Sequence, residues 1–221
     1  MPDITADLEA GVLRMGRACL FTAASLAQIS DWSAVDEEDL AALDRAGLVS
    51  DGVLHAEFAA VALTVGRPVA ELLLSLATSK RRAFCPGWVG SQLAVLAIPA
   101  DDGLDDVKAA PTRFLPIRLA AFLGLGPRPM GDGVYPDGES LEREIGSSLR
   151  LHWSITVRWR GGDRVQEVWD AGPDGIWVGA PSERGSPVRR TSARDVWLAL
   201  VRLLPSDEEL AAGDEGLKQT T

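Results

Sequence analysis

The sequence has few of the residues on which enzyme chemistry usually depends. Its 221 residues include two histidines, His55 and His152, two cysteines, Cys19 and Cys85, and one tyrosine. Two cysteines are too few for a disulfide framework, so we expect free thiols in a reducing compartment. Neither histidine has a second histidine or cysteine at the spacing of a local metal site, and only Glu57 lies close to one of them. We therefore expect no metal, no cofactor and no catalytic residue.

One catalytic alternative stays open, because the fold can bring together residues that are distant in sequence. Cys85 and His152 would then act as nucleophile and base. A buried structural thiol is the commoner fate of a single cysteine. The glycine-rich stretch 124–133 lacks the Lys-Ser/Thr ending of a phosphate loop. The sequence therefore favours no class of enzyme.

Long hydrophobic runs are also absent. No segment approaches the roughly 18 consecutive apolar residues of a membrane-spanning helix. A secretory signal would place positive charge early, but Asp3, Asp7 and Glu9 precede the first arginine, Arg14. We expect a cytoplasmic protein that does not insert into membranes.

Basic charge is scarce in the first half of the chain. Residues 1–110 hold 16 acidic and 8 basic side chains, whereas residues 111–221 hold 16 and 14, and the formal net charge is −10. Segment 26–49 is similar to the second and third helices of a helix-turn-helix, but its candidate recognition helix begins with the acidic run 36–39, which phosphate would repel. A nucleic-acid-binding or regulatory function is therefore the alternative, and the main expectation includes no nucleic acid.

Regular patterns indicate both helices and strands. The N-terminal third reads as helices over 4–15, 36–48 and 56–65, the second capped by Asp36 or one of its neighbours. Between residues 69 and 98, short apolar runs favour strands, although 69–77 is ambiguous because Leu and Ala also favour helix. A short strand over 107–109 and a helix from 111 or 112 to 123 follow.

The second half contains the clearest strand. Residues 149–159 alternate strictly between apolar and polar side chains, which is typical of a half-buried strand. Turns at 161–163 and 171–175 lead into two further strands, giving a three-stranded meander. A helix from Ser192 to Leu204 follows, with Ser192 as its N-cap and Val196, Leu200 and Leu203 on one face.

Both halves share the order helix, antiparallel strands, polar turn, short strand, apolar helix. We therefore predict an α+β fold that is a tandem duplication with pseudo-two-fold symmetry, an antiparallel sheet flanked by helices. The first repeat with its N-terminal helices covers 1–125, a Gly/Pro linker covers 126–138, the second repeat covers 139–205, and an acidic flexible tail covers 206–221. The two repeats are expected to form one compact domain.

Aromatic side chains are concentrated in the second meander, which holds four of the seven tryptophans. Trp153 lies in the middle of the alternating strand and is expected to be buried. Tryptophans near strand ends either cover a core edge or anchor a partner. Arginines of the polar face either meet an acidic partner or are simply solvated. The candidate partner-binding residues are Trp159, Trp169, Trp177, Arg158 and Arg160.

Two stretches of the chain resemble the EspG family of chaperones associated with the ESX (type VII) secretion system. Residues 40–74, "LAALDRAGLVSDGVLHAEFAAVALTVGRPVAELLL", are similar to that family's opening helix, Gly-Leu corner, Asp-Gly turn, second helix and proline. Residues 155–178 and 192–205 are similar to its closing pattern, a strand ending in Trp, a hairpin, an Asp-Gly turn and a helix ending in Leu-Leu-Pro.

The resemblance implies a cytosolic, non-enzymatic protein with a quasi-two-fold α+β fold. It implies binding to the helical tip of PE/PPE heterodimeric secretion substrates, which stay soluble for export. The chain is shorter than typical members, so a WXG-type secreted protein is an alternative partner. A homodimer also stays open. No contact residue of the family can be assigned to a position here.

Overall fold

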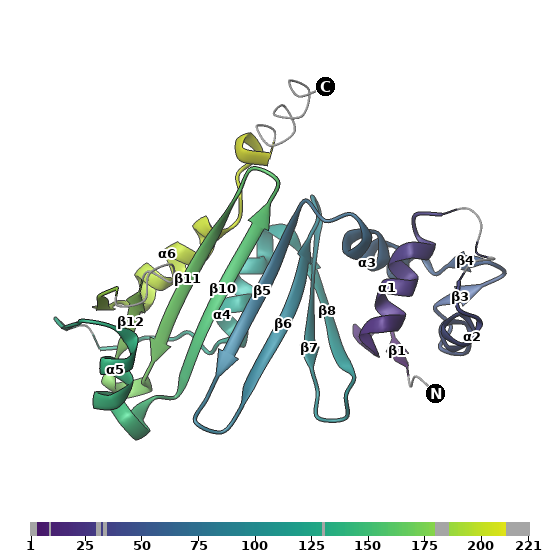
Figure 1. The fold of residues 1–221 in the computed structure, drawn as a ribbon. Coiled ribbons are helices and arrows are strands. Elements are labelled where there is room, and N and C mark those ends of the chain that lie inside the picture. Colours follow the sequence, from purple (N-terminus) through teal and green to yellow (C-terminus); the bar gives the residue numbers. More distant parts are fainter. Residues whose placement is uncertain are drawn as a thin grey trace. The chain divides into compact units, whose positions relative to one another are not determined.

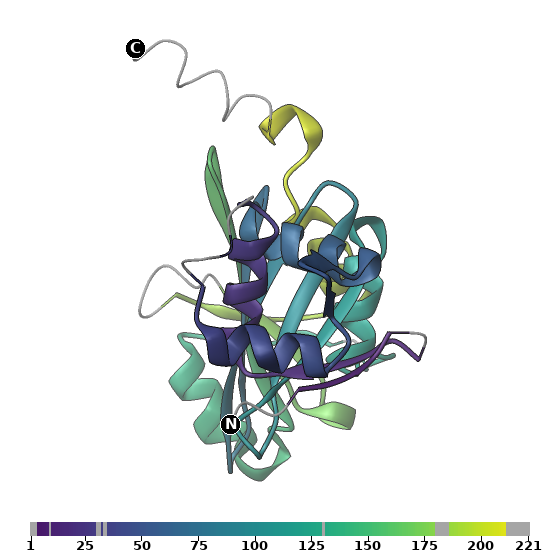
Figure 2. The same cartoon turned by 90° about the vertical axis from the view of Figure 1, so that its right-hand side faces the viewer.

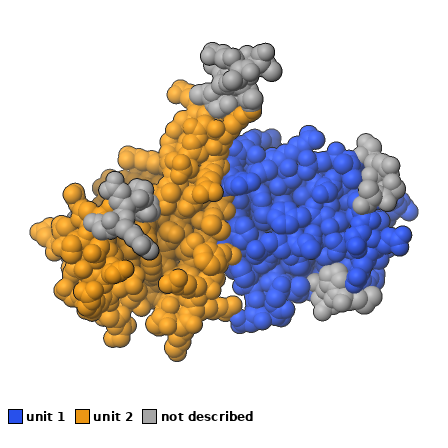
Figure 3. Space-filling model, in the orientation of Figure 1, with its two compact units in different colours: residues 1–71, 85–113 blue, residues 72–84, 114–221 orange. Residues whose placement is uncertain are grey.

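The computed structural model describes residues 4–8, 10–29, 32, 35–129, 131–179 and 186–210. The chain divides into two compact units, coloured in Figure 3: unit 1 contains residues 1–71 and 85–113, and unit 2 contains residues 72–84 and 114–221. Helices and antiparallel strands occur in both, which confirms the α+β class. Among the described residues, no helix is long and apolar enough to span a membrane.

Unit 1 combines three helices with antiparallel strands. Its helices are α1 (Arg17–Leu26), α2 (Glu37–Arg45) and α3 (Ala56–Gly66), and its small hairpin is β3 (Val49–Ser50) with β4 (Val53–Leu54). The strand order is β1-β2-β8-β7-β6, with β1 (Thr5–Asp7), β2 (Val12–Met15), β8 (Asp105–Pro111), β7 (Leu93–Pro99) and β6 (Arg82–Val89). The first three residues of β6, 82–84, belong to unit 2. Figure 2 looks onto the helices of this unit. Met15, Leu20, Leu43 and Phe58 are among the fully buried side chains of its core.

The helix predicted over 4–15 is wrong, because this segment forms the hairpin β1–β2. The Asp7 carboxylate accepts a hydrogen bond from the backbone N–H of Ala10 at 2.9 Å, and Gly11 has φ +66°. A side chain that hydrogen-bonds the backbone a few residues on favours a turn over a helix. Leu13 and Met15 are buried on alternate positions of β2, which is the period of a strand.

The hairpin β3–β4 was not predicted, although its turn carries a strong signal. Asp51 and Gly52 both have positive φ, 50° and 74°. A two-residue hairpin turn of this type requires positive φ at both central positions, which explains the Asp-Gly pair. The family resemblance includes an Asp-Gly turn at this place, but the two strands that flank it were not predicted.

Unit 2 is a sheet with helices on both faces. The strand order is β5-β10-β11-β12-β13-β9, with β5 (Ala70–Ala77), β10 (Leu151–Trp159), β11 (Gly162–Asp170), β12 (Ile176–Gly179), β13 (Val188–Thr191) and β9 (Val134–Tyr135). Its helices are α4 (Leu115–Phe122), α5 (Gly138–Ile145) and α6 (Ala193–Leu203). In Figures 1 and 2, α4 and α6 lie on one face of this sheet and α5 on the other.

Most of the elements predicted for this half are confirmed. The meander is β10, β11 and β12, and β10 alternates as expected, with Trp153, Ile155 and Val157 buried. The Ser192 hydroxyl accepts from the backbone N–H of Asp195 at 3.1 Å, so this residue is the N-cap of α6. The ambiguous run 69–77 is a strand, because it pairs in the sheet, and tertiary pairing overrides helix propensity.

The segment after α6 contains a capping box. Ser206 Oγ accepts from the backbone N–H of Glu209, whose carboxylate accepts from the backbone N–H of Ser206 at 2.8 Å. Residues 206–210 of the expected acidic tail therefore begin a helical turn. Residues 211–221 lie outside the described part of the chain.

Gly138 provides a test of how α5 packs on the sheet. A Cβ at this position would lie 2.6 Å from Cζ2 of the buried Trp169. Gly138→Ala is expected to lower the free energy of unfolding by about 1–3 kcal/mol, because the ring has little room to move. Gly16→Ala, whose Cβ meets nothing within 4 Å, is the matched control. Urea denaturation measures both, and an unchanged midpoint for Gly138→Ala would contradict this packing.

Candidate protein-binding face

Unit 2 leaves part of one sheet face exposed. On β5, Leu72 and Leu74 are buried, whereas Leu73, which points to the opposite face, is 43% exposed. On β10, the polar residues His152 and Ser154 occupy the same side as Leu73, because successive side chains alternate across a strand. This is the side away from α4 and α6 (Figure 1). We call it the open face.

A shallow pocket of about 150 Å³ lies on the open face. Its most exposed apolar wall is Phe84, 57% exposed, and Arg82 is its only cationic wall. A pocket of this size holds one side chain of a partner, which is how interfaces place their anchors. The residues lining it are Ser75, Leu76, Ala77, Arg82, Phe84, His152, Trp153 and Ser154.

His152 is fixed at the edge of this pocket. Its ring stacks on Trp169, with centroids 4.5 Å apart and planes at 8°. Its Nε2 lies 2.9 Å from Glu167 and its Nδ1 lies 3.5 Å from Glu142. Trp169 Nε1 in turn donates to Glu142 at 2.9 Å. These contacts hold the imidazole in one orientation, so this pocket wall is preformed.

Two of the predicted tryptophan anchors are buried. Trp169 is 5% exposed and Trp177 is 4% exposed, so neither side chain is available to a partner. Both belong to a small core beneath α5, together with Leu141 and Val188. Strand-end position suggested exposure, but α5 covers this end of the sheet. The correction is that these two rings stabilise the fold rather than contact a partner.

Trp159 is half-buried and belongs to another environment. The Arg164 guanidinium lies over its ring at 5.1 Å, and Arg164 also donates to the carbonyl oxygens of Arg202 and Leu204 at the end of α6. The same arginine pairs with Glu209. It also lines a groove of about 440 Å³ between β11 and α6. Trp159 therefore supports the helix terminus on the face opposite to the pocket.

The two predicted arginines differ from each other. Arg158 is exposed and shares the strand face of His152, with Asp163 as its register partner on β11. Arg160 is exposed in the turn that follows β10. Of the five candidates, Arg158, Trp169 and Trp177 lie on the strand face that carries the pocket, and of these three only Arg158 is exposed. The pocket region also contains Leu73, Arg82 and Phe84, which sequence reasoning did not single out. For Leu73 and Phe84, the signal is an apolar side chain at a solvent-facing position of a strand.

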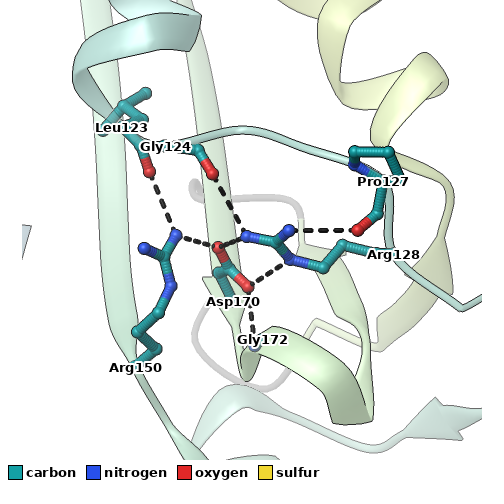
Figure 4. A network of polar contacts seen from close by, with 7 residues as sticks. All are labelled: Leu123, Gly124, Pro127, Arg128, Arg150, Asp170 and Gly172. Carbon is teal, nitrogen blue, oxygen red and sulfur yellow. Dashed lines mark hydrogen bonds and ion pairs between the residues drawn. The ribbon is translucent and has the colours of Figure 1, made fainter.

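Two other arginines of unit 2, Arg128 and Arg150, are used inside the fold. Asp170, 1% exposed, receives hydrogen bonds from Nε and Nη2 of Arg128, both at 2.9 Å, and from Arg150 (Figure 4). Arg128 also donates to the carbonyl oxygen of Gly124, and Arg150 to that of Leu123, at the end of α4. Burial raises the pKa of Asp170, but the hydrogen bonds from both arginines outweigh burial, and the net pKa is lowered.

The cysteines do not support nucleophilic chemistry. Cys85 is fully buried, and burial, reinforced by the negative charge of Asp105, raises the pKa of its thiol to about 11. Burial and a hydrogen bond to Asp39 raise the pKa of Cys19 to about 12. The thiolate is the reactive form, so both groups are unreactive near neutral pH. Across the described residues, no group of three or more His, Cys, Asp or Glu could hold a metal ion.

The N-terminal region presents acidic groups where a recognition helix would need basic ones. Asp36 caps α2, and Glu37 and Glu38 follow in its first turn. Asp39 accepts hydrogen bonds from Thr22 at 2.6 Å and from Cys19, which fixes α2 against α1. Negative charge at this helix start suits the helix dipole and repels phosphate. The nucleic-acid alternative therefore gains no support from this geometry.

Comparison with known proteins identifies a solved structure with a similar fold. No protein-family model matches the sequence, and no curated protein matches it. Among solved structures, the chain is similar to that of the Mycobacterium tuberculosis type VII secretion system chaperone EspG5 in complex with the PE25-PPE41 dimer. The TM-score is 0.57 at 13% sequence identity, over 88% of this chain and 97% of that one. The chain thus has the fold of a type VII secretion chaperone, as the sequence resemblance implied.

Asp170→Asn tests the ion network. Removing one partner of a buried charge cluster leaves the arginines uncompensated, so the variant is expected to lose about 3 kcal/mol of unfolding free energy at pH 7. Because the folded pKa of Asp170 is lowered, its contribution is present above about pH 4, the unfolded value, and is lost as pH falls through the folded pKa.

Urea denaturation of both proteins between pH 7 and pH 3 measures this difference. The difference in free energy of unfolding between wild type and Asp170→Asn should become smaller below about pH 4. The exposed Asp163→Asn serves as the control and should lose little at any pH. A gap that is independent of pH would show that Asp170 acts by shape rather than by charge.

Thiol accessibility tests the buried cysteines. Both thiols should resist alkylation by iodoacetamide in the native protein at neutral pH and react fully in urea, because burial keeps them protonated and enclosed. Mass spectrometry of the intact chain counts the adducts. Rapid alkylation of Cys85 in the folded protein would contradict this prediction and would support a nucleophilic role for this residue.

Proposed function

We propose that this protein is a non-enzymatic chaperone of type VII secretion that acts in the cytoplasm and binds the apolar helical tip of a secreted substrate. The substrate is a PE/PPE-like heterodimer or a WXG-type helical protein. The fold supports the proposal, because the similar EspG5 structure is a complex with the PE25-PPE41 dimer. The observation that carries it in this chain is the open face of unit 2, where Leu73 and Phe84 are exposed beside a preformed pocket.

The mechanism is the covering of apolar surface. A helical bundle that exposes an apolar tip is prone to aggregate, and burial of that tip removes apolar area from water. A sheet supplies a stiff platform, and a partner side chain inserted beside Phe84 would be packed on three sides. The stacking of His152 on Trp169 keeps the pocket wall ordered before binding, which lowers the entropic cost of association. No bond is made or broken.

We also propose that the fold consists of two repeats that arose by tandem duplication. The elements α3, β5, β6, β7, β8 and α4 follow one another in the same order as α5, β10, β11, β12, β13 and α6. This shared order supports two α+β repeats within residues 1–125 and 139–205, related by pseudo-two-fold symmetry and joined by 126–138. Each repeat would supply one helix, four strands and a second helix.

Co-expression tests the proposed function. The chain is expressed together with the helical secreted protein or heterodimer encoded beside its gene, and the mixture is analysed by gel filtration. We expect one complex and a substrate that aggregates when expressed alone. Phe84→Ser is expected to abolish co-elution. Its free energy of unfolding, measured by urea denaturation, should stay within about 0.5 kcal/mol of wild type, because the ring is largely exposed.

Two control variants locate the binding surface. Phe122→Ser removes a comparably exposed ring from α4, on the other face of unit 2, and should bind normally. Val53→Ser changes an apolar groove of unit 1 that is also lined by Ile29 and Leu63. Loss of binding in Val53→Ser with normal binding in Phe84→Ser would move the docking site to that groove. A substrate that is soluble alone and never co-elutes would end the chaperone proposal.

A further inference from the structure

Negative charge is unequally divided between the units. Unit 1 holds 16 acidic and 6 basic side chains, so it accounts for the whole formal net charge of −10. Unit 2 holds 16 of each. Five of its acidic residues follow α6, at 207–209, 214 and 215, so the rest of unit 2 carries an excess of positive charge. The open face therefore lies in the unit without net charge, and the other unit carries the acidic excess.

The most concentrated basic element of unit 2 is the turn between β5 and β6. Residues 80–82, Lys-Arg-Arg, are the one place in the sequence with three consecutive basic residues. All three are exposed. A chain that has only three lysines places one of them at this tip. Lys80 and Arg82 therefore bring two like charges close together at this turn, where an anionic group of a partner would be attracted.

Thr78 holds this turn in a defined shape. Its backbone N–H donates to the carbonyl oxygen of Arg81 at 2.8 Å, which closes the hairpin. Its hydroxyl accepts from the backbone N–H groups of Lys80 and Arg81 at 3.3 and 3.1 Å. Side chains on a braced hairpin turn project from fixed backbone positions, unlike those on a flexible loop. The backbone that carries the cationic side chains is therefore ordered before any partner arrives.

The basic turn is continuous with the pocket of the open face. Arg82 lines the pocket together with Phe84, two residues further along the same strand face. No acidic side chain lines this pocket. Lys80 lies two residues before Arg82, at the tip of the same hairpin. An apolar subsite and a cationic subsite thus lie side by side on one element of unit 2.

We infer that the open face selects a helical tip on which an apolar side chain is followed, within about one helical turn, by a carboxylate. The apolar side chain occupies the pocket beside Phe84, and the carboxylate pairs with Arg82 and Lys80. This inference rests on the proposed function and adds the charge of the partner to it. Arginine favours such pairing, because its planar guanidinium binds a carboxylate through two hydrogen bonds.

The charges contribute to selection more than to total affinity. Exposed ion pairs add little energy, whereas a charge at the rim of an interface steers encounter and disfavours like-charged partners. A tip with lysine or arginine in place of the carboxylate would meet repulsion at the turn. The preference should also fall with salt, since the screening length is roughly 10 Å at 0.1 M ionic strength. The basic turn therefore acts as a filter among similar apolar tips.

A display selection tests the inference without a known substrate. The probe is a phage library of α-helical hairpins whose tip residues are randomised, panned on the full chain. Tips with an apolar residue and a nearby Asp or Glu should be enriched over the same tips with Lys or Arg by about five-fold or more at low salt. The double variant Lys80→Glu, Arg82→Glu should reverse this preference, and 0.5 M NaCl should weaken it in both proteins.

Matched variants separate the outcomes. Arg118→Glu makes the same kind of change on the exposed side of α4 and should keep the wild-type preference. Apolar tips enriched with no charge preference would overturn the inference and leave the chaperone proposal standing. No enrichment of any tip would overturn both. Failure of every tip together with salt-sensitive binding of a single-stranded dT oligonucleotide would assign the basic turn to phosphate, which also overturns the inference.

Discussion

The organisation of unit 2 depends on the strict alternation of β10. Successive side chains of a strand point to opposite faces, so Trp153, Ile155 and Val157 enter the core while His152 and Ser154 face the pocket. A slip of one residue in the pairing with β11 would exchange the two sets, burying Arg158 and exposing Trp153. The register thus fixes both the core and the open face in one step. A partner surface that depends on such a register is as stiff as the sheet itself.

Sequence reasoning succeeded where local rules decide the outcome. The alternation of β10 and the N-cap at Ser192 are short-range features, and both were predicted correctly. It failed over residues 4–15, where weak periodicity suggested a helix but Asp7 and Gly11 form a turn. The segment therefore contains a local signal for a turn, but the weak helical periodicity was given more weight. The Asp51–Gly52 turn shows the same error in a milder form.

The candidate site could be predicted only in part, because exposure is a tertiary property. Trp169 and Trp177 lie on the same strand face as His152, yet α5 covers the two rings and not the pocket. Nothing in the sequence of the meander says where a preceding helix will pack. Arg150 likewise lies on the polar side of the meander sequence, yet it binds the buried Asp170, twenty residues away along the chain. By contrast, Phe84 occupies an outward position of the strand β6, a signal that the sequence contains but that the prediction of strands over 69–98 did not use.

The capping box at Ser206 shows that ordered contacts continue beyond the end of α6. Arg164 binds the last carbonyl oxygens of α6 and Glu209 together, so it ties the β10–β11 hairpin to residues beyond the helix. A fragment cut at Pro205, the end of the second repeat, would leave this arginine without its carboxylate and remove the capping box. A fragment that keeps these contacts therefore extends at least to Leu210.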